Sequence, residues 1–149
     1  MLERGNKVTL MDVETEDDSV VKAYYDWIGP FVEEYGIGGL RINAAWHIRA
    51  DCWQLFAGAA RVFCVGEVFG NDPAATSEWQ GPLDSILNFP LGKGILDEFT
   101  IPGPPNISAL ETTTKAIWDL FKDARLLEKF LENQDVPCKV NLSVVPQSL

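Results

Sequence analysis

The sequence has few cysteines, few basic residues and a single histidine, and each shortage excludes a class of protein. The three cysteines among 149 residues, Cys52, Cys64 and Cys138, form no Cys-x-x-Cys pair. Neither a thiolate metal site nor a dense disulfide framework is therefore expected. Lysine and arginine total 12 against 22 aspartates and glutamates, which gives a net charge of −10. A chain this acidic is not expected to bind nucleic acid or an anionic membrane surface, because both attract basic residues.

Long hydrophobic runs are also missing. No run approaches the roughly 18 apolar residues of a membrane-spanning helix. Residues 1–7 contain no apolar core of a signal peptide, so the chain is expected either to be cytosolic or to be a piece whose start is missing. What the sequence does have is 46% hydrophobic and 11% aromatic residues, which is enough to bury a core. We expect a single domain over residues 1–149 without internal repeats.

Helix-like and strand-like patterns alternate along the chain. Apolar residues recur at a spacing of three to four from Val20 to Tyr35, between the N-cap candidates Asp17 and Asp18 and the stop signal Gly36. Two more helices are expected, over residues 50–60 and after the capping box that Ser108 begins. Residues 69–82 and 92–107 are rich in turn formers and are expected as loops. Four apolar runs are expected as strands: Leu40–Ala44, Val62–Val68, Ser85–Phe89 and Leu127–Asn133.

Polar residues stand at the ends of three of these strands. Alternating helices and buried strands predict parallel βαβ units, whose functional groups gather at the carboxyl ends of the strands. Asn43, Glu67 and Asp135 occupy such positions. Taken singly, each is more often a turn residue or a solvated acid than a functional group. Their sequence surroundings make them candidates.

Six segments resemble the α-amylases of glycoside hydrolase family 13. Gly39-Leu40-Arg41-Ile42-Asn43-Ala44-Ala45-Trp46-His47 resembles the fourth-strand motif of that family. Gly66-Glu67-Val68-Phe69 and Glu132-Asn133-Gln134-Asp135 resemble its fifth-strand and seventh-strand motifs. Further similarity lies in residues 9–15, ahead of the third barrel helix, and in residues 25–28 and 87–90, which resemble fungal secreted α-amylases. The order and spacing of these segments agree over residues 5–139.

The resemblance implies an α/β fold that is part of a TIM (β/α)8 barrel. About four parallel strands and about three helices are expected, without the first three strands, the last strand and the C-terminal β-domain of the family. A whole barrel takes about 250 residues, so the chain is expected to be an incomplete catalytic-domain fragment. An open sheet exposes strand edges, through which the chain is expected to self-associate.

The resemblance also implies roles for the residues at the strand ends. Glu67 is the expected general acid/base, Asp135 the expected transition-state stabiliser, and residue 43 falls on the nucleophile position. The family has Asp there, whereas this sequence has Asn43. A neutral amide is a poor nucleophile, so the chain is expected to be catalytically impaired. Arg41, which bonds the nucleophile carboxylate in the family, is expected to lose its ionic partner.

The remaining implied residues concern sugar and calcium. Arg41, Trp46, His47 and Gln134 fall on substrate-binding positions, with Trp46 where a Lys and Gln134 where a His is usual. Asp12 and the backbone carbonyl of His47 match calcium ligands. Calcium takes six to eight oxygens, so an incomplete site is expected.

Three interpretations of function stay open. The family activity is retaining endo-hydrolysis of α-1,4-glucosidic bonds in starch and glycogen, with starch or a maltooligosaccharide as partner and secretion as location. Alternatively, the chain is a non-catalytic glucan-binding protein in which Trp46 stacks on a sugar. The third interpretation is a non-functional, truncated gene product.

Overall fold

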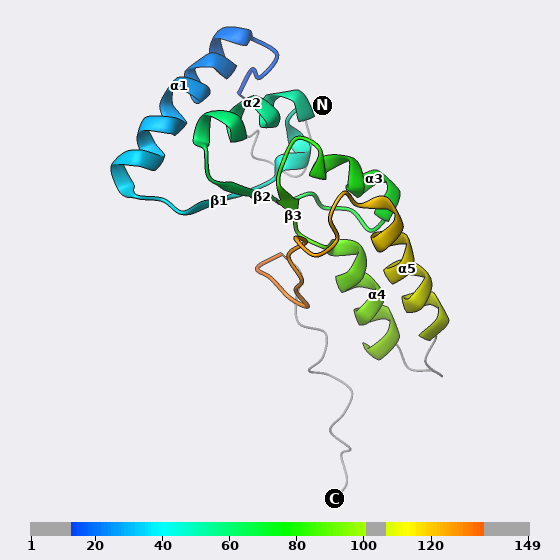
Figure 1. Ribbon diagram of the computed structural model, residues 1–149. Helices are drawn as coiled ribbons and strands as arrows, with labels where there is room; N and C mark the ends of the chain where they lie inside the picture. The colour runs from blue at the N-terminus through cyan, green and yellow to red at the C-terminus, as the bar shows by residue number, and fades with distance from the viewer. Residues whose placement is uncertain (1–12, 101–106, 136–149) are drawn as a thin grey trace, which may run out of the picture.

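The computed structural model describes residues 13–100 and 107–135, and within that part three parallel strands alternate with five α-helices (Figure 1). Asp12 and Cys138 lie outside the described residues. The elements are α1 Asp18–Tyr35, β1 Gly39–Ile42, α2 Ala50–Ala60, β2 Phe63–Gly66, α3 Pro73–Ser77, β3 Ser85–Ile86, α4 Phe89–Thr100 and α5 Ile107–Leu120. Two short 3-10 turns, η1 Ala45–His47 and η2 Glu78–Gln80, lie in the connections.

Helix α1 begins and ends where its capping residues predict. The side chain of Asp17 accepts a hydrogen bond from the Ser19 N–H at 2.8 Å, which satisfies one of the free donors of the first turn. Gly36 ends the helix with φ 60°, in the left-handed region that glycine adopts without strain. The expected helix over residues 50–60 is confirmed as α2. Helix α5 begins at Ile107, one residue before the capping box.

The three strands form one parallel sheet in the order β1-β2-β3. Ile42 pairs with Gly66 and Gly66 with Ile86, so these residues share the face that the helices cover. Helices α1 and α2 pack together over β1 and β2, while α5 packs against α3 and α4 beyond β3 (Figure 1). The core on this face includes Ile28, Val32, Trp53, Cys64, Val68, Ile86, Ile117 and Phe121.

The opposite face of the sheet is more open. Arg41 is exposed and Phe63 is 44% exposed, although both lie on strands. Their neighbour Val65, which pairs with Arg41, is half-buried. This face therefore keeps apolar surface and a cation accessible, whereas the helix-covered face is buried.

The expectation of a fourth strand over Leu127–Asn133 is met only by a single parallel bridge between Leu87 and Glu128. Leu127 is buried, but Glu128 and Lys129 are exposed, so the apolar run that a buried strand needs is interrupted. The third strand is also shorter than expected, because helix α4 begins at Phe89.

Two predicted loops are partly helical. Within residues 69–82, α3 forms because the side chain of Asp72 caps it and Pro73 occupies its first turn. Within residues 92–107, α4 continues to Thr100 despite two glycines. A Cβ on Gly94 would lie 3.3 Å from Leu110 Cδ1, so this glycine permits the close approach of α4 and α5. Packing thus outweighs the low helix propensity of glycine here.

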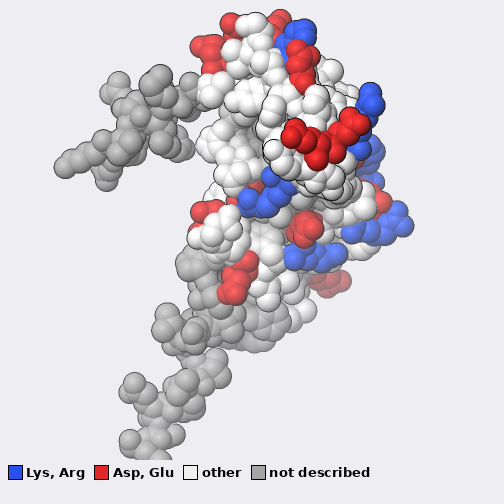
Figure 2. All heavy atoms as spheres, turned by 90° about the vertical axis from the view of Figure 1, so that its left-hand side faces the viewer, with Lys and Arg blue, Asp and Glu red and all other residues white. Residues whose placement is uncertain are grey.

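Charged side chains of both signs lie on the surface. Acidic and basic side chains intermingle on the face that carries α1, with uncharged surface between them (Figure 2). In the described part of the chain, no helix combines the length and the apolar character that crossing a membrane requires.

Candidate functional site at the strand ends

The turn after β1 is held in place from two sides. Ala44 adopts φ 50°, an uncommon conformation for a residue with a side chain. The next residue, Ala45, is fully buried, and its carbonyl accepts a hydrogen bond from Trp53 Nε1 at 2.9 Å. Ala45 also packs closely over Gly66 of β2, where a Cβ would lie 3.3 Å from the Ala45 Cβ. These contacts fix the backbone that carries Asn43.

Glu67 follows β2 directly and is 7% exposed. Its N–H donates to the Ile42 carbonyl at 2.8 Å, which continues the ladder between the first two strands. Its side chain turns toward the neighbouring strand end, where Oε2 accepts a hydrogen bond from the Ala44 N–H at 3.2 Å. The sheet therefore places the carboxylate of Glu67 beside the turn that contains Asn43.

Arg41 joins the amide and the carboxylate. Its Nη1 donates to Asn43 Oδ1 at 3.1 Å, and its Nη2 lies 3.4 Å from Glu67 Oε1. The expectation that Arg41 loses its ionic partner is wrong, because Glu67 takes that place. The Arg41 side chain is also 40% exposed, so its charge is partly solvated rather than buried. The structure thus brings together three of the predicted site residues.

Two tryptophans stack on each other in the connections that follow β1 and β2. Trp46 in η1 is 48% exposed, and its ring lies 6.1 Å from that of Trp79, with 27° between the ring planes. Trp79 belongs to η2 and is not among the site residues predicted from the sequence. Its position twelve residues after Glu67 is the one sequence feature that could have indicated it. His47 is exposed, and its N–H donates to the Ala44 carbonyl at 3.0 Å. Such a stacked pair offers an aromatic face to solvent.

A second aromatic row follows the strand ends. Phe69, after β2, lies 4.9 Å from Phe89, which begins α4, and Phe89 lies 4.9 Å from Phe130. Phe69 is 62% exposed, whereas Phe89 is buried. The row links the end of β2 to the segment that follows α5.

The structure does not join the other predicted residues to the cluster. Gln134 and Asp135 are exposed, and the Asp135 N–H donates to Asn133 Oδ1 at 2.9 Å. Across residues 13–100 and 107–135, no hydrogen bond or ion pair connects Asp135 to Arg41, Asn43 or Glu67. Nor do the described residues contain a group of three or more His, Cys, Asp or Glu side chains able to hold a metal ion. The predicted calcium ligand Asp12 lies outside them.

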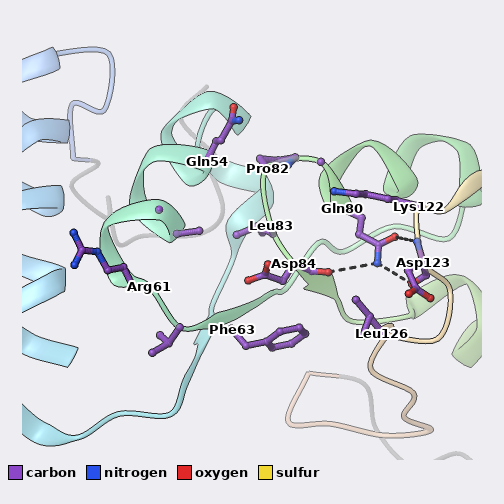
Figure 3. A pocket seen from close by; sticks show the side chains of 14 residues that line it. Gln54, Arg61, Phe63, Gln80, Pro82, Leu83, Asp84, Lys122, Asp123 and Leu126 are labelled. Carbon is purple, nitrogen blue, oxygen red and sulfur yellow. Dashed lines mark hydrogen bonds between the residues drawn. The ribbon is translucent and has the colours of Figure 1, made fainter. Parts of the chain in front are cut away.

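A cavity of about 770 Å³ lies at the other end of the strands (Figure 3). Phe63 at the start of β2 and Asp84 just before β3 line it, so it opens at the amino ends of the strands. Gln80 spans its wall, donating to the Asp123 carbonyl at 2.8 Å and accepting from the Asp123 N–H at 3.0 Å. Parallel α/β folds place their sites at the carboxyl ends of strands. The candidate site is therefore the Arg41 cluster and not this cavity.

Comparison with known proteins shows what the chain is similar to. The chain is related to the α-amylases of glycoside hydrolase family 13, as several curated proteins and solved structures show. No protein-family model matches it.

Among the curated relatives, α-amylase 1 of Lipomyces kononenkoae is 38% identical over 132 residues, which cover 89% of this chain and 21% of that protein. For α-amylase 2 of Schwanniomyces occidentalis the identity is 35% over 136 residues, covering 91% and 26%. The solved structure of an α-amylase from Malbranchea cinnamomea superposes with a TM-score of 0.78 at 37% identity, over 82% of this chain and 26% of that one. The chain thus spans about a quarter of the length of these relatives.

Proposed function

We propose that this chain supplies the acid/base part of an α-amylase-type site for α-1,4-glucans, and that it holds the glucan without hydrolysing it. The observation that carries the proposal is the cluster in which Arg41 contacts Asn43 Oδ1 at 3.1 Å and Glu67 Oε1 at 3.4 Å. In this proposal the substrate is starch or a maltooligosaccharide, as the relationship to α-amylases suggests.

The chemistry of retaining glycosidases explains why hydrolysis fails at this site. Such enzymes use two carboxyl groups about 5–5.5 Å apart, one as nucleophile and one as acid/base. Glu67 is a carboxyl group near a strand end and can serve as the acid/base. Asn43 offers an amide where an anionic oxygen must attack the anomeric carbon. Removing one member of a catalytic set commonly lowers the rate by about four to six powers of ten.

Binding requires less than catalysis does. The Trp46 ring, which is 48% exposed and stacks on half-buried Trp79, offers an aromatic surface to the apolar side of a pyranose ring. Arg41 and His47 are exposed, and in the proposal they supply hydrogen-bond donors to sugar hydroxyls. In the proposal, Gln134 contacts the sugar and Asp135 is the third carboxylate, as the family resemblance implies.

Calcium, secretion and self-association belong to the proposal on the same resemblance. Asp12 and the His47 carbonyl would supply two oxygens to calcium, which falls short of the six to eight it takes, so no step here depends on the ion. Self-association is supported by the accessible edge of β1, which has β2 as its one neighbour in the described sheet. Sedimentation of a dilute sample tests it: a monomer would contradict the expectation.

The test of the proposed function is a gain of activity from a single substitution. Residues 13–135 replace the matching segment of the Malbranchea cinnamomea α-amylase, which supplies the rest of a barrel, and reducing-sugar release from soluble starch is measured. We expect no hydrolysis from this chimera and restored hydrolysis after Asn43→Asp. The matched control, Asn43→Asp with Glu67→Gln, keeps the new carboxylate but lacks the acid and should be inactive. Hydrolysis by the unsubstituted chimera, with Asn43 confirmed intact by mass, would contradict the proposal.

If neither the chimera nor its Asn43→Asp variant hydrolyses starch, the result separates the two remaining interpretations. If the chimera folds, as judged by circular dichroism, and Asn43→Asp restores nothing, then the segment is a non-functional remnant rather than an impaired amylase site. That outcome refutes the proposed function. Retention of the unsubstituted chimera on amylose resin without hydrolysis is the result expected for glucan binding.

A further inference from the structure

Asn43 and the N–H of the residue after it both make hydrogen bonds to charged side chains. Deamidation of asparagine begins when the N–H of the following residue loses its proton and its nitrogen attacks the side-chain amide carbon. That following N–H is the one on Ala44, and it donates to Glu67 Oε2 at 3.2 Å. The oxygen of the amide, Asn43 Oδ1, accepts a hydrogen bond from Arg41 Nη1 at 3.1 Å. A carboxylate thus contacts the proton that must leave, and a cation contacts the oxygen on which negative charge develops.

We propose that Asn43 is a self-deamidation site, at which Glu67 and Arg41 promote conversion of the amide to a carboxylate. Glu67 accepts the Ala44 N–H proton, and the Ala44 nitrogen forms a bond to Asn43 Cγ. Arg41 stabilises the oxyanion that forms at Oδ1. The Cγ–Nδ2 bond then breaks, and the amide nitrogen leaves as ammonia with the proton that Glu67 returns. Water adds to the resulting succinimide and opens it to aspartate or isoaspartate, so one water is consumed and one ammonia released, with no change in oxidation state.

The backbone at this position is free of the sheet ladder. Strand β1 ends at Ile42, so Asn43 and Ala44 lie in the turn that follows it. Asn43 is exposed, which gives water access to the succinimide. The left-handed conformation of Ala44, with φ 50°, already departs from the extended backbone of the strand. Ring closure therefore need not break a strand-to-strand hydrogen bond of Asn43.

The same chain contains two asparagines that serve as comparisons. Asn71 is exposed in the turn before α3, and no hydrogen bond or ion pair among the described residues joins it to an arginine or glutamate. Asn88 is 1% exposed and accepts a hydrogen bond from the Leu91 N–H, so folding protects it. Asn71 reports the rate of an exposed asparagine without this arrangement, and Asn88 reports whether the chain stays folded.

The consequence for activity rests on the proposed function, whereas the reaction itself does not. Opening of the succinimide to aspartate places a carboxylate at the nucleophile position beside Glu67. Opening to isoaspartate lengthens the backbone by one methylene and displaces the side chain. A fraction of the aged protein would thus carry the group that the gene-encoded amide lacks.

The experiment is incubation of the full chain in ¹⁸O-labelled water, followed by digestion and mass spectrometry of the peptides. A synthetic peptide with the sequence of residues 39–49 gives the rate that sequence alone sets. With Asn88 intact as the measure of folding, we expect Asn43 to convert at least about tenfold faster in the chain than in the peptide, and faster than Asn71. Glu67→Gln and Arg41→Gln should each lower the Asn43 rate toward that of the peptide while leaving Asn71 unchanged.

Two results would overturn the inference. One is an Asn43 rate in the folded chain that does not exceed the peptide rate. The other is an accelerated rate that Glu67→Gln leaves unaltered, since the carboxylate would then play no part. Because the readout is mass and label incorporation without any glucan, failure here leaves the proposed function standing. Conversely, a deamidated chimera that contains aspartate at residue 43 and still fails to hydrolyse starch contradicts the proposed function alone.

Discussion

Gly66 sets how closely the turn after β1 approaches β2, and its replacement by alanine is the sharpest test of that packing. Gly66 lies in β2 immediately before Glu67, on the face that the helices cover. An added Cβ would overlap Leu83 Cδ1 and would lie 3.3 Å from the Ala45 Cβ. Leu83 is 3% exposed and Ala45 is fully buried, so neither has free space into which to move. Gly66→Ala must therefore displace the side chain of Leu83, the turn that carries Asn43, or both.

The magnitude follows from the cost of overpacking. An extra methyl group in a packed core destabilises a protein by about 1–3 kcal/mol. Gly58 in α2 provides the matched control, because nothing lies within 4 Å of a Cβ placed there. Gly58→Ala should stabilise the chain by about 0.5–1 kcal/mol, since glycine disfavours the interior of a helix. The same chemical change is thus expected to have opposite signs at the two positions.

Urea unfolding followed by circular dichroism measures both variants. We expect a lower midpoint for Gly66→Ala, a higher one for Gly58→Ala, and unchanged slopes. Leu83→Ala alone should destabilise the chain because it empties a buried position. The double variant Gly66→Ala with Leu83→Ala should lose less stability than the sum of the two single changes, with a coupling energy of about 0.5–3 kcal/mol. Equal midpoints for Gly66→Ala and the unsubstituted chain would refute the close packing of the turn on β2.

Three further predictions concern other parts of the chain. Burial raises the pKa of the Cys64 thiol to about 11, and nearby Asp84 adds to the effect. Because the folded state favours the protonated thiol, this contribution to stability is fully present below about pH 9 and is lost as the pH rises toward 11. Urea unfolding should show that decline, and Cys64→Ala should remove it. Gln80→Leu removes the two hydrogen bonds that buried Gln80 makes with the backbone of half-buried Asp123. The free energy of unfolding should fall by about 1–3 kcal/mol, and an unchanged urea midpoint would mean that Gln80 does not hold this loop. The hydrogen bonds from Arg125 lower the pKa of Asp123 to about 2. The carboxylate therefore stabilises the fold when the pH is above its ordinary pKa, and this stability is lost as the pH falls toward 2. In urea unfolding at several pH values, Arg125→Gln should weaken that acid dependence.

Sequence reasoning located the helices whose ends are set by local chemistry. The caps Asp17 and Gly36 act within one turn of α1, so the chain itself carries the signal. The same reasoning missed α4, because its glycines are read as breakers until Gly94 is seen to admit Leu110 of α5. It also extended a fourth strand across Glu128, where the structure has a single bridge to Leu87. Packing between distant segments decides both cases.

In the candidate site, too, local sequence indicated the residues, whereas their contacts depend on segments far apart in the chain. The resemblance of two strand motifs predicted Arg41, Asn43 and Glu67 as site residues, and in the structure Arg41 contacts both of the others. The ion pair between Arg41 and Glu67 was not predictable, because it depends on the direction in which the Glu67 side chain turns from its own strand end. Trp79 was missed for a related reason: its contact with Trp46 joins two connections, one after β1 and the other after β2. Asp135 remains a predicted site residue.

The central claim is that this site holds an α-glucan and leaves it intact, and a titration with maltoheptaose tests it most directly. Isothermal calorimetry measures binding to the chain, and chromatography of the same sample measures the sugar recovered afterwards. We expect saturable binding, after which maltoheptaose is recovered uncleaved. Trp46→Ala should weaken that binding about tenfold. The matched control Trp118→Ala, which removes another exposed tryptophan, should leave the affinity unchanged. No saturable heat, or shorter maltooligosaccharides produced while Asn43 remains an amide, would contradict the central claim.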